Sequence, residues 1–333
     1  MKYLDNRAYC DDVETALRHT VHFDLLKNKR ILVLGATGLI GSFLVDCFLY
    51  ANENLHAEIS IYAVSRNLER LQERFGNAQN EQLHFIEADV TTIGTEFSFD
   101  YIIHAASYGH PKAFREIPVE VLLSNVTGTH RVLEIARSNP ACRVLYVSSG
   151  EAQEEVDHLT PRACYPMGKR AAETLCLCCY QEYGVATVIA RPCHTFGANA
   201  AGHDNRAAAQ FIASAAAGKN IEMYSAGEQR RSFSYVADCA SGLMTALTSG
   251  TAGTVYGISS GESCTVREFA GWCAELGGCS VEMHLPTQIQ QAETSPIKDQ
   301  IVDNGALAKL GWRPAFTIEG GIERSIRIMH QIY

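Results

Sequence analysis

RILVLGATGLIGSFL, residues 30–44, is the stretch of this chain that decides its fold. It places an apolar run before Gly35, Gly38 and Gly41, and a second apolar run after them. This order predicts a strand, a tight turn and a helix. The first glycine allows the turn, the second lets the backbone approach a phosphate, and the third packs the helix on the strand. Because the helix N-terminus presents free N–H groups and a positive dipole end, the stretch predicts a dinucleotide-binding unit.

The alternation of strand and helix continues along the chain. Apolar, β-branched runs predict strands at Arg30–Leu34, Ile59–Val64, Leu83–Ala88, Tyr101–Ala105, Arg143–Val147, Ala186–Arg191 and Thr254–Ile258. Helical periodicity predicts helices at Leu39–Leu49, Leu68–Phe75, Val119–Ser138, Tyr165–Tyr183 and Ala207–Ala217. Since near-continuous apolar strands alternate with helices, we expect an α/β fold of Rossmann type, with a doubly wound parallel sheet.

The remaining segments are less regular. A polar prefix begins the chain, with a helix expected at Asp11–His22, and we assign it no function. Glycine, proline and polar residues increase after Arg191, which fits a smaller lobe over the carboxyl edge of the sheet, where such folds bind ligands. The expected division is an extension at 1–28, a dinucleotide-binding domain at 29–192 to which 235–260 returns, and a substrate-binding lobe at 193–234 and 261–333.

Composition narrows the class of protein. The 333 residues carry a net charge of −9 with no basic run, which argues against a nucleic-acid partner. No apolar run reaches membrane-spanning length and no leader pattern precedes the 12 cysteines, so we expect a cytoplasmic protein with reduced thiols. Cys176, Cys178 and Cys179 lie in a helical pattern without further ligands at metal spacing, so no metal site is predicted.

Two further signals fall where this fold places its active site. The stretch LYVSSGE, residues 145–151, ends a predicted strand with hydroxyl groups, and Tyr165 and Lys169 open a predicted helix at i and i+4. An ammonium beside a phenol lowers the phenol's pKa, so Tyr165 could act as a base near neutrality. Ser149 could share the proton of a substrate hydroxyl.

With these motifs in place, the chain resembles the extended short-chain dehydrogenase/reductases of the nucleotide-sugar epimerase/dehydratase family. The resemblance runs from about Lys29 to Pro314. It is carried by GATGLIG (35–41), ADV (88–90), HAAS (104–107), SNVTGT (124–129), VSSGE (147–151), YPMGK (165–169), ARPCHTFG (190–197), RRSFSYVADCASGL (230–243) and KLGWRP (309–314).

The resemblance implies roles for particular residues. The expected catalytic residues are Ser149, Glu151, Tyr165 and Lys169. The expected cofactor ligands are Gly35, Thr37, Gly38, Leu39, Ile40, Gly41, Ser65, Arg66, Asp89, Val90, Ala105, Ala106, Ser107, Asn125, Tyr165 and Lys169. The expected ligands of a nucleotide-diphosphate sugar are Ser107, Ser149, His194, Arg206 and Arg231. The forked guanidinium of an arginine suits a diphosphate because it binds oxyanions bidentately.

The branch of chemistry depends on residues near Ser149. Members of the resembled family transiently oxidise C4 of the sugar, which acidifies C5 or lets a C5 carboxylate leave as CO₂. Epimerases usually carry a small residue two places after the catalytic Ser or Thr, whereas dehydratases and decarboxylases carry Glu, and this chain has Glu151. We therefore expect a lyase with 4,6-dehydration as the leading reaction. A 4-epimerase and a UDP-glucuronate-type decarboxylase are the alternatives.

Four departures from the family pattern bear on this choice. Gly150 stands where dTDP-glucose dehydratases have an aspartic acid that protonates the leaving hydroxyl. HPKAF (110–114) and RSFSYVAD (231–238) are most similar to UDP-glucuronate decarboxylases, but AETSPIKD (292–299) lacks the arginine those enzymes place there. His194 replaces the usual asparagine, and Ser149 and Tyr165 are unusually close in sequence.

The cofactor expectation rests on the end of the second strand. NAD enzymes of this fold usually have an acidic residue there, whereas this chain has Ser65 and Arg66, so we expect NADP or NAD with NADP slightly favoured. A simple carbonyl reductase that exchanges its cofactor freely is a further alternative. The long C-terminal lobe with Arg206 and Arg231 disfavours it, because a small ketone needs no diphosphate ligand. A non-catalytic dinucleotide sensor is disfavoured by the presence of both Tyr165 and Lys169. The helices at Val119–Ser138 and Tyr165–Tyr183 resemble a pair that forms a dimer interface in the family, so we expect a homodimer.

Overall fold

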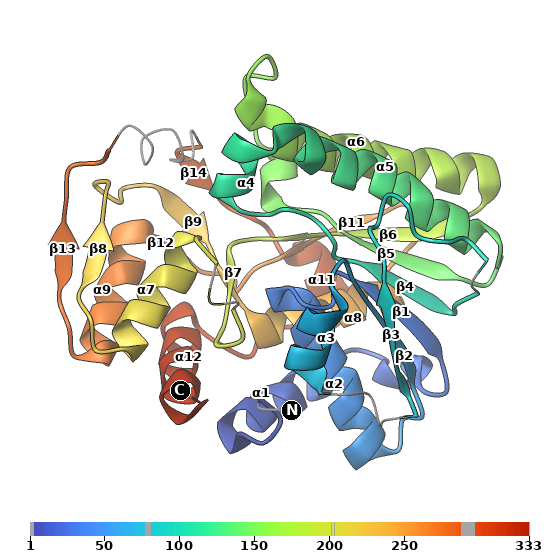
Figure 1. Cartoon of the computed structure of the whole chain (residues 1–333), viewed down its shortest axis with the longest axis horizontal. Helices are drawn as coiled ribbons and strands as arrows, with labels where there is room; N and C mark the ends of the chain where they lie inside the picture. Colours follow the sequence, from blue (N-terminus) through green and yellow to red (C-terminus); the bar gives the residue numbers. More distant parts are fainter. Residues whose placement is uncertain are drawn as a thin grey trace.

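A seven-stranded parallel sheet organises the computed structural model, which describes residues 3–76, 81–96, 98–200, 202, 204–287 and 297–332 (Figure 1). The strands lie in the order β11-β6-β5-β4-β1-β2-β3. All neighbouring pairs of this sheet are parallel. The strands span β1 Arg30–Leu34, β2 Ser60–Ser65, β3 Leu83–Glu87, β4 Tyr101–His104, β5 Arg143–Val147, β6 Ala186–Pro192 and β11 Val255–Ile258. The predicted doubly wound fold is confirmed.

Helices cover both faces of this sheet. Successive side chains of β1 alternate between two cores: Ile31 and Val33 join one, and Leu32 and Leu34 join the other. On the first face lie α2 Leu39–Leu55, α3 Leu68–Phe75 and α8 Val236–Ser249, and on the second lie α5 Pro118–Arg137 and α6 Cys164–Tyr183. Because every strand of the middle of the sheet is buried on both sides, the near-continuous apolar pattern of the sequence is explained.

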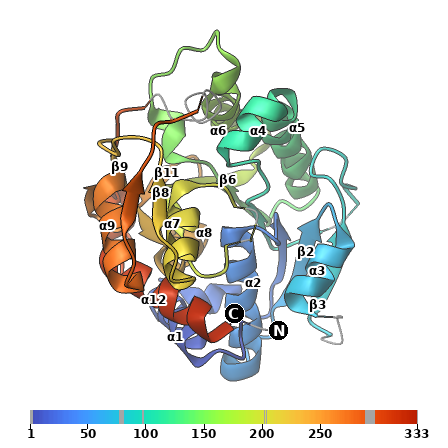
Figure 2. The same ribbon diagram turned by 60° about the vertical axis from the view of Figure 1, so that its left-hand side comes forward.

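A smaller lobe lies beside the carboxyl edge of the sheet, brought forward in Figure 2. Three small sheets, β12-β9-β14, β13-β8 and β10-β7, form its strands. The strands span β7 Thr195–Phe196, β8 Ile221–Met223, β9 Arg230–Ser232, β10 Ser234–Tyr235, β12 Ser263–Thr265, β13 Val281–Met283 and β14 Asp299–Gln300. The helices span α7 Ala207–Ala216, α9 Val266–Gly277, α11 Gly305–Lys309 and α12 Ile318–Ile332. Segment 235–260 supplies α8 and β11, so this part of the chain joins the large sheet again.

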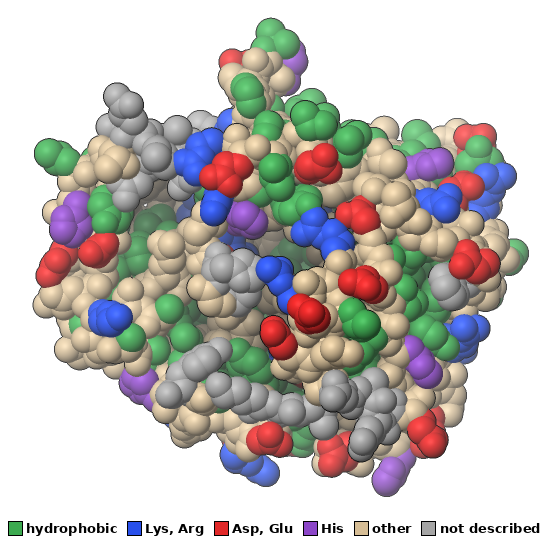
Figure 3. Space-filling view, viewed as in Figure 1, with side chains coloured by type: hydrophobic (Ala, Val, Ile, Leu, Met, Phe, Trp, Pro, Cys, Tyr) green, Lys and Arg blue, Asp and Glu red, His purple; other side chains and the backbone are tan. Residues whose placement is uncertain are grey.

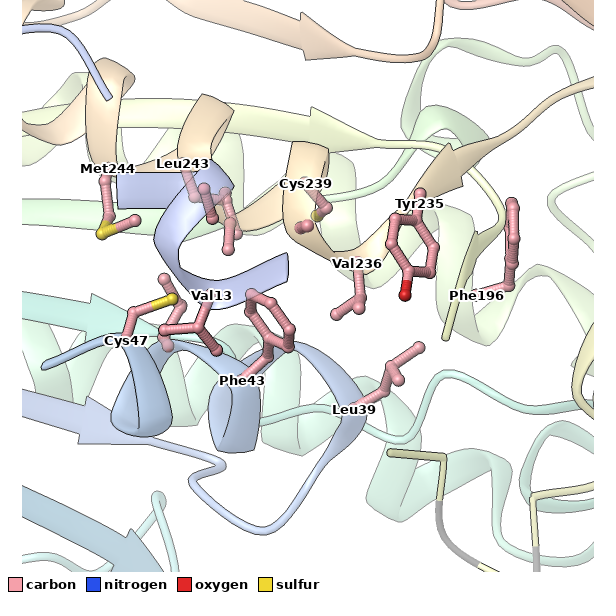
Figure 4. Close-up of a cluster of buried hydrophobic side chains, with 14 of the residues drawn as sticks. Val13, Leu39, Phe43, Cys47, Phe196, Tyr235, Val236, Cys239, Leu243 and Met244 are labelled. Atoms are coloured by element: carbon pink, nitrogen blue, oxygen red, sulfur yellow. The ribbon is translucent and has the colours of Figure 1, made fainter. Parts of the chain in front are cut away.

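The N-terminal helix α1 spans Arg7–Arg18 and differs from the predicted Asp11–His22. It begins earlier because the Asn6 side chain caps it, accepting a hydrogen bond from the Tyr9 N–H at 3.0 Å. The apolar side of α1 packs between α2 and α8, as the cluster around Val13 and Phe43 shows in Figure 4. The prefix is therefore part of the main core.

Two buried carboxylates join α1 to both parts of the molecule. Tyr9 donates to Asp46 of α2 at 2.6 Å, and Asp46 also pairs with Arg74 of α3. One turn further along α1, Asp12 accepts from Tyr235 at 2.5 Å and pairs with Arg324 of α12. Near the two ends of the chain, α1 contacts α12, and Asn6 Nδ2 donates to Gln331 Oε1 at 2.9 Å (Figures 1 and 2).

All 12 cysteines are free thiols, and the described residues contain no group of three or more potential metal ligands. Among the described residues, no helix is both long and apolar enough to cross a membrane.

Candidate active site

The turn between β1 and α2 is shaped by two crowded glycines. Gly35 has a φ of +82°, and a Cβ there would lie 2.8 Å from the backbone nitrogen of Ala106. A Cβ on Gly41 would collide with the carbonyl oxygen of Gly35. Gly38 is the N-cap of α2 and offers no side-chain cap, so the first N–H groups of the helix lack a side-chain acceptor. These features fit a dinucleotide pyrophosphate, which would lie against Gly38, Leu39 and Ile40.

Polar residues lie at the neighbouring strand ends. Thr37 and Ser65 hydroxyls are 3.3 Å apart at the end of β2. Arg66 Nη1 donates to the hydroxyl of Tyr108, and its guanidinium carbon lies 4.5 Å from the centroid of the Tyr108 ring. The carboxylate of Asp89, before Val90, accepts from the Thr91 N–H at 2.8 Å. No acidic residue ends β2, as the sequence indicated.

The segment after β4 lies against α5. Ala105 donates its N–H to Leu34 of β1, which continues the ladder one residue beyond the strand. Ser107 Oγ donates to Asn125 Oδ1 at 3.0 Å. The Asn125 amide in turn donates to the carbonyl of Val121 at 2.7 Å and is fully buried. Asn125 therefore fixes the hydroxyl of Ser107, and both residues belong to the predicted cofactor ligands.

The predicted catalytic residues come from the end of β5 and the first turns of α6. The Ser149 hydroxyl lies close enough to the Tyr165 phenol to lower the pKa of Tyr165. Lys169 Nζ lies 5.8 Å from the centroid of the Tyr165 ring. Ser149 also accepts from the Glu151 N–H at 3.1 Å and caps the short 3-10 helix η2, Gly150–Gln153. Lys169 is only 2% exposed and donates to the carbonyl of Val147 at 2.8 Å. The structure thus brings Ser149, Tyr165 and Lys169 together at one strand end.

The pKa of Tyr165 differs from the expectation that Lys169 brings it near neutrality. Burial raises the pKa of Tyr165 to about 12, against smaller lowering effects of the Ser149 hydrogen bond, Arg206 and Arg162. Burial also lowers the pKa of Lys169 to about 7, partly opposed by Glu173. The reason for the difference is that Lys169 is buried and Tyr165 is partly buried against the cluster that contains Phe114. Desolvation outweighs the charge effects, and the Lys169 ammonium is directed to a carbonyl.

Arg162 is a site residue that the sequence did not reveal. It belongs to the 3-10 helix η3, Pro161–Ala163, and its guanidinium forms an ion pair with Glu151 at 2.9 Å. The guanidinium carbon lies 4.7 Å from the centroid of Phe114, whose ring stacks on Tyr165 with centroids 4.8 Å apart. Phe114 lies in α4, Pro111–Glu116. The basic residue three places before Tyr165 was the available signal.

Gly150 is closely packed against the C-terminal segment. A Cβ at this position would lie 2.9 Å from Val302 Cγ2 and 3.5 Å from Gln300 Nε2. Space for a larger residue between Ser149 and Glu151 is therefore filled by side chains from the end of the chain. The segment Ala292–Pro296, which holds most of the stretch where an arginine is lacking, lies outside the described residues.

His194 follows β6 and pairs with Gln300. Its Nε2 lies 2.6 Å from Gln300 Oε1, and its backbone has a φ of +35°. His194 is exposed at the surface of the protein, but desolvation by the surrounding atoms, with a contribution from Arg231, lowers the pKa of its ring to about 4. The ring is therefore neutral and donates through Nε2 to Gln300. Gln300 Nε2 is buried without a hydrogen-bond partner among the described residues.

The two predicted diphosphate ligands have different surroundings. Arg206, the N-cap of α7, forms a forked pair with the Asp204 carboxylate, with Nη2 to Oδ2 at 2.5 Å. Arg231 is 4% exposed and donates to the carbonyls of Ile297 and Lys298 at 2.5 and 2.7 Å. Arg231 therefore holds the strand β14 in place in this structure. Figure 3 shows a hollow at the centre of this face, with basic, acidic and histidine side chains gathered around it.

Comparison with known proteins decides the family. The model of the NAD dependent epimerase/dehydratase family matches residues 31–259. The chain belongs to this family. The UDP-glucuronic acid decarboxylase 1 of Xenopus tropicalis is 29% identical over 312 residues, covering 90% of this chain and 71% of that protein.

Solved structures of the epimerase/dehydratase fold agree with the sheet described above. The epimerase Mth375 from Methanothermobacter thermautotrophicus has a TM-score of 0.79 at 21% identity and covers 95% of this chain and 96% of its own. The dTDP-glucose 4,6-dehydratase DesIV from Streptomyces venezuelae, solved with bound NAD, has a TM-score of 0.77 at 23% identity and covers 91% and 97%. The predicted family and fold are confirmed, and the family is described as NAD dependent.

Proposed function

We propose that this chain oxidises C4 of a UDP-hexuronic acid transiently, releases the C5 carboxylate as CO₂ and returns the hydride to give a nucleotide pentose. The observation that carries the proposal is the site around Ser149. Here Ser149, Tyr165 and Lys169 lie together, and Gly150 is packed too closely to be replaced by an acidic residue. The chain's similarity to a UDP-glucuronic acid decarboxylase over 90% of its length supports the same substrate class.

Tyr165 and Ser149 would handle the proton of the 4-hydroxyl. Tyr165 Oη would take this proton, and the Ser149 hydroxyl would hold the resulting C4 oxygen by a hydrogen bond. When bound, the oxidised nicotinamide supplies a hydride acceptor and a positive charge. Lys169 would stabilise the tyrosinate, and Ser107 and Asn125 would fix the floor of the site.

Loss of CO₂ needs fewer protein groups than loss of water. A C4 ketone with a C5 carboxylate can release CO₂ without an acid to protonate a leaving group, and the electron pair moves onto the C4 oxygen. A proton from water then adds to C5 as the C4 ketone forms again, and the returning hydride reduces that ketone. Dehydration requires a proton on the departing 6-hydroxyl, and Gly150 cannot supply it. Glu151 would then serve as both base and acid, while Arg162 pairs with its carboxylate at 2.9 Å. That pair holds the Glu151 carboxylate on Arg162, so the same side chain would have to leave its partner to serve both steps.

The 4,6-dehydration expected from the sequence is the second candidate. Glu151 favours it, because a carboxylate beside Ser149 can remove the C5 proton. A 4-epimerase remains the weaker alternative, because that reaction has no use for Glu151. The sensor alternative is disfavoured by the intact set of Ser149, Tyr165 and Lys169.

Arg206 is proposed as the main diphosphate ligand. Its guanidinium would exchange the Asp204 carboxylate for phosphate oxygens, which suit the same fork. Arg231 would contribute charge from beneath the site while holding β14.

For the cofactor, the family supports NAD. The slight preference for NADP rests on Ser65 and Arg66, and Arg66 contacts Tyr108 in this structure.

The test is proton NMR in D₂O with UDP-glucuronic acid, UDP-glucose and dTDP-glucose as separate substrates. The proposal predicts a UDP-pentose carrying one solvent deuterium at C5, formed only from UDP-glucuronic acid. A deuterated 6-deoxy-4-keto product from a hexose would show that the chain catalyses dehydration and not decarboxylation. Inversion at C4 with the C5 proton retained would assign the chain to the epimerases.

A further inference from the structure

Glu173 is a buried carboxylate that connects α6, which carries Tyr165 and Lys169, to the ends of β5 and β6. It lies in α6, two turns after Tyr165 and one turn after Lys169, and is 7% exposed. Its Oε1 accepts from Ser148 Oγ at 2.5 Å, and Ser148 is the residue before Ser149. Arg191 of β6 donates to both carboxylate oxygens, from Nε at 2.8 Å and from Nη2 at 2.6 Å.

These contacts fix the geometry of the site from behind. The Ser148 contact ties the end of β5 to α6, and the Arg191 contact ties β6 to the same point of α6. A forked arginine–carboxylate pair has a defined geometry, so rotation of Glu173 would move both strand ends. An oriented group misplaced by about 1 Å can cost about 100-fold in rate.

The same carboxylate supplies charge beside Lys169. The Lys169 ammonium donates a hydrogen bond to the Val147 carbonyl at 2.8 Å. Glu173 raises the pKa of Lys169, against the larger lowering effect of burial. The titratable and charged groups around this pair are Arg191 of β6, His104 of β4, Tyr146 of β5, and Tyr165 and Cys176 of α6.

We propose that Glu173 is a positioning residue, which holds Ser149 against Tyr165 and keeps a negative charge beside Lys169. The measurement of turnover rests on the proposed function. The measurement of NAD⁺ binding requires only that the chain binds this cofactor. Glu173 touches no reacting atom in this arrangement. It acts through Ser148, Arg191 and Lys169.

The test compares Glu173→Gln with Glu182→Gln, a control on the exposed side of the same helix. Glu173→Gln should lower turnover of the nucleotide sugar at least about tenfold, because the strand ends lose their shared anchor. It should also move the pH limb that reports Lys169 to lower pH, because removing an anion lowers the pKa of an ammonium. Glu182→Gln should change neither quantity.

A second variant separates positioning from folding. Glu173→Gln leaves the partly buried Arg191 without its anionic partner, which destabilises the fold by itself. The double variant with Glu173→Gln and Arg191→Met removes that unpaired charge and should recover thermal stability. The proposal predicts that turnover and the pH limb remain changed, and that Glu173→Asp recovers part of both.

Binding of NAD⁺ keeps the proposal testable without a substrate. The pH at which NAD⁺ affinity changes should fall in Glu173→Gln and stay as in wild type in Glu182→Gln. If no nucleotide sugar turns over in the wild type, the proposed function fails while this measurement still tests Glu173. Wild-type affinity and pH dependence in Glu173→Gln, or full recovery of turnover in the double variant, would overturn the proposal.

Discussion

At the scale of single residues, Gly150 and Glu151 separate the possible reactions. Gly150 lies under Val302 and Gln300, so the protein has filled the space that a neighbouring acid would occupy. Glu151 is present but held by Arg162. In the sequence, Gly150 shows only the lack of an aspartic acid. In the structure, Gly150 is packed against residues near the end of the chain.

Replacing Gly150 tests this packing. Gly150→Ala should lower the free energy of unfolding by about 1–3 kcal/mol, because its Cβ would lie 2.9 Å from Val302 Cγ2. Gly271→Ala in α9 is the matched control, since a Cβ there meets nothing within 4 Å and alanine favours a helix. Urea unfolding measures both. Equal stability of Gly150→Ala and wild type would show that the site has room for a side chain.

Tyr165 is the second residue with a direct test. Tyr165→Phe should lower turnover by about 10²–10⁴-fold, because the proton of the 4-hydroxyl then has no acceptor. NAD⁺ binding and thermal stability should remain close to wild type, since the ring that stacks on Phe114 is retained. Steady-state rates and NAD⁺ titration check the two parts. Turnover within a few-fold of wild type would remove Tyr165 from the mechanism.

At the scale of elements, α1 is the helix that the sequence describes least well. It packs on α2 and α8 and presents Asp12 to Tyr235 and Arg324. Through Tyr9, α1 also contacts Asp46 of α2, the helix that follows the glycine-rich turn. The helix therefore links the smaller lobe to the helices that cover the large sheet.

Removing the Asp12 carboxylate should weaken this link. Asp12→Ala leaves Arg324 without its buried partner and should lower the free energy of unfolding by about 3 kcal/mol. Asp11→Ala is the control one residue away, because its ion pair with Arg7 is 44% and 88% exposed at the two side chains and contributes little. Thermal unfolding of both variants measures the difference. A melting temperature of Asp12→Ala equal to that of Asp11→Ala would contradict the role of α1.

The pH dependence of the same variant has a definite sign. Burial raises the pKa of Asp12 from 3.8 to about 6, so the folded state binds this proton more tightly than the unfolded state. The contribution of Asp12 to stability is therefore greatest below about pH 4 and declines as pH rises through 6. The difference in unfolding free energy between wild type and Asp12→Ala should be larger at pH 5 than at pH 8. The opposite order would show that the charged carboxylate is the favoured buried form.

The sequence predicted the repeating elements better than the contacts between them. β1, β5 and α3 have the predicted bounds, because each is a continuous apolar or amphipathic run between clear breaks. Helix α1 was misplaced because its limits depend on a cap at Asn6 and on packing against distant helices. The pairing of Arg162 with Glu151 was not predicted, since which partner a charged side chain chooses is set by three-dimensional placement.

At the scale of the whole molecule, α5 and α6 leave apolar side chains exposed. Val119 and Leu123 of α5 are 64% and 44% exposed, and Leu177 and Tyr180 of α6 are 41% and 43% exposed. Both helices cover the same face of the sheet and contact each other along their length (Figure 1). The outer surface of these two helices is the candidate for the homodimer interface that the resemblance implies.

A charged substitution tests this surface. Leu123→Glu together with Leu177→Glu should shift the protein from dimer to monomer, because the charges would be buried at an apolar contact. Leu285→Glu is the control, since Leu285 is 94% exposed in the smaller lobe and away from α5 and α6. Sedimentation velocity measures the assembly. A wild-type monomer, or a dimer that survives the double substitution, would contradict the proposed interface.

Transient oxidation at C4 is the claim on which the proposed reaction depends, and an isotope at C4 tests it most directly. UDP-glucuronic acid carrying deuterium at C4 should turn over more slowly than the unlabelled compound, and its pentose product should retain that deuterium at C4. This result is predicted because the hydride leaves C4 and returns to it within one turnover. Release of CO₂ with no isotope effect and with protium from solvent at C4 would contradict the account.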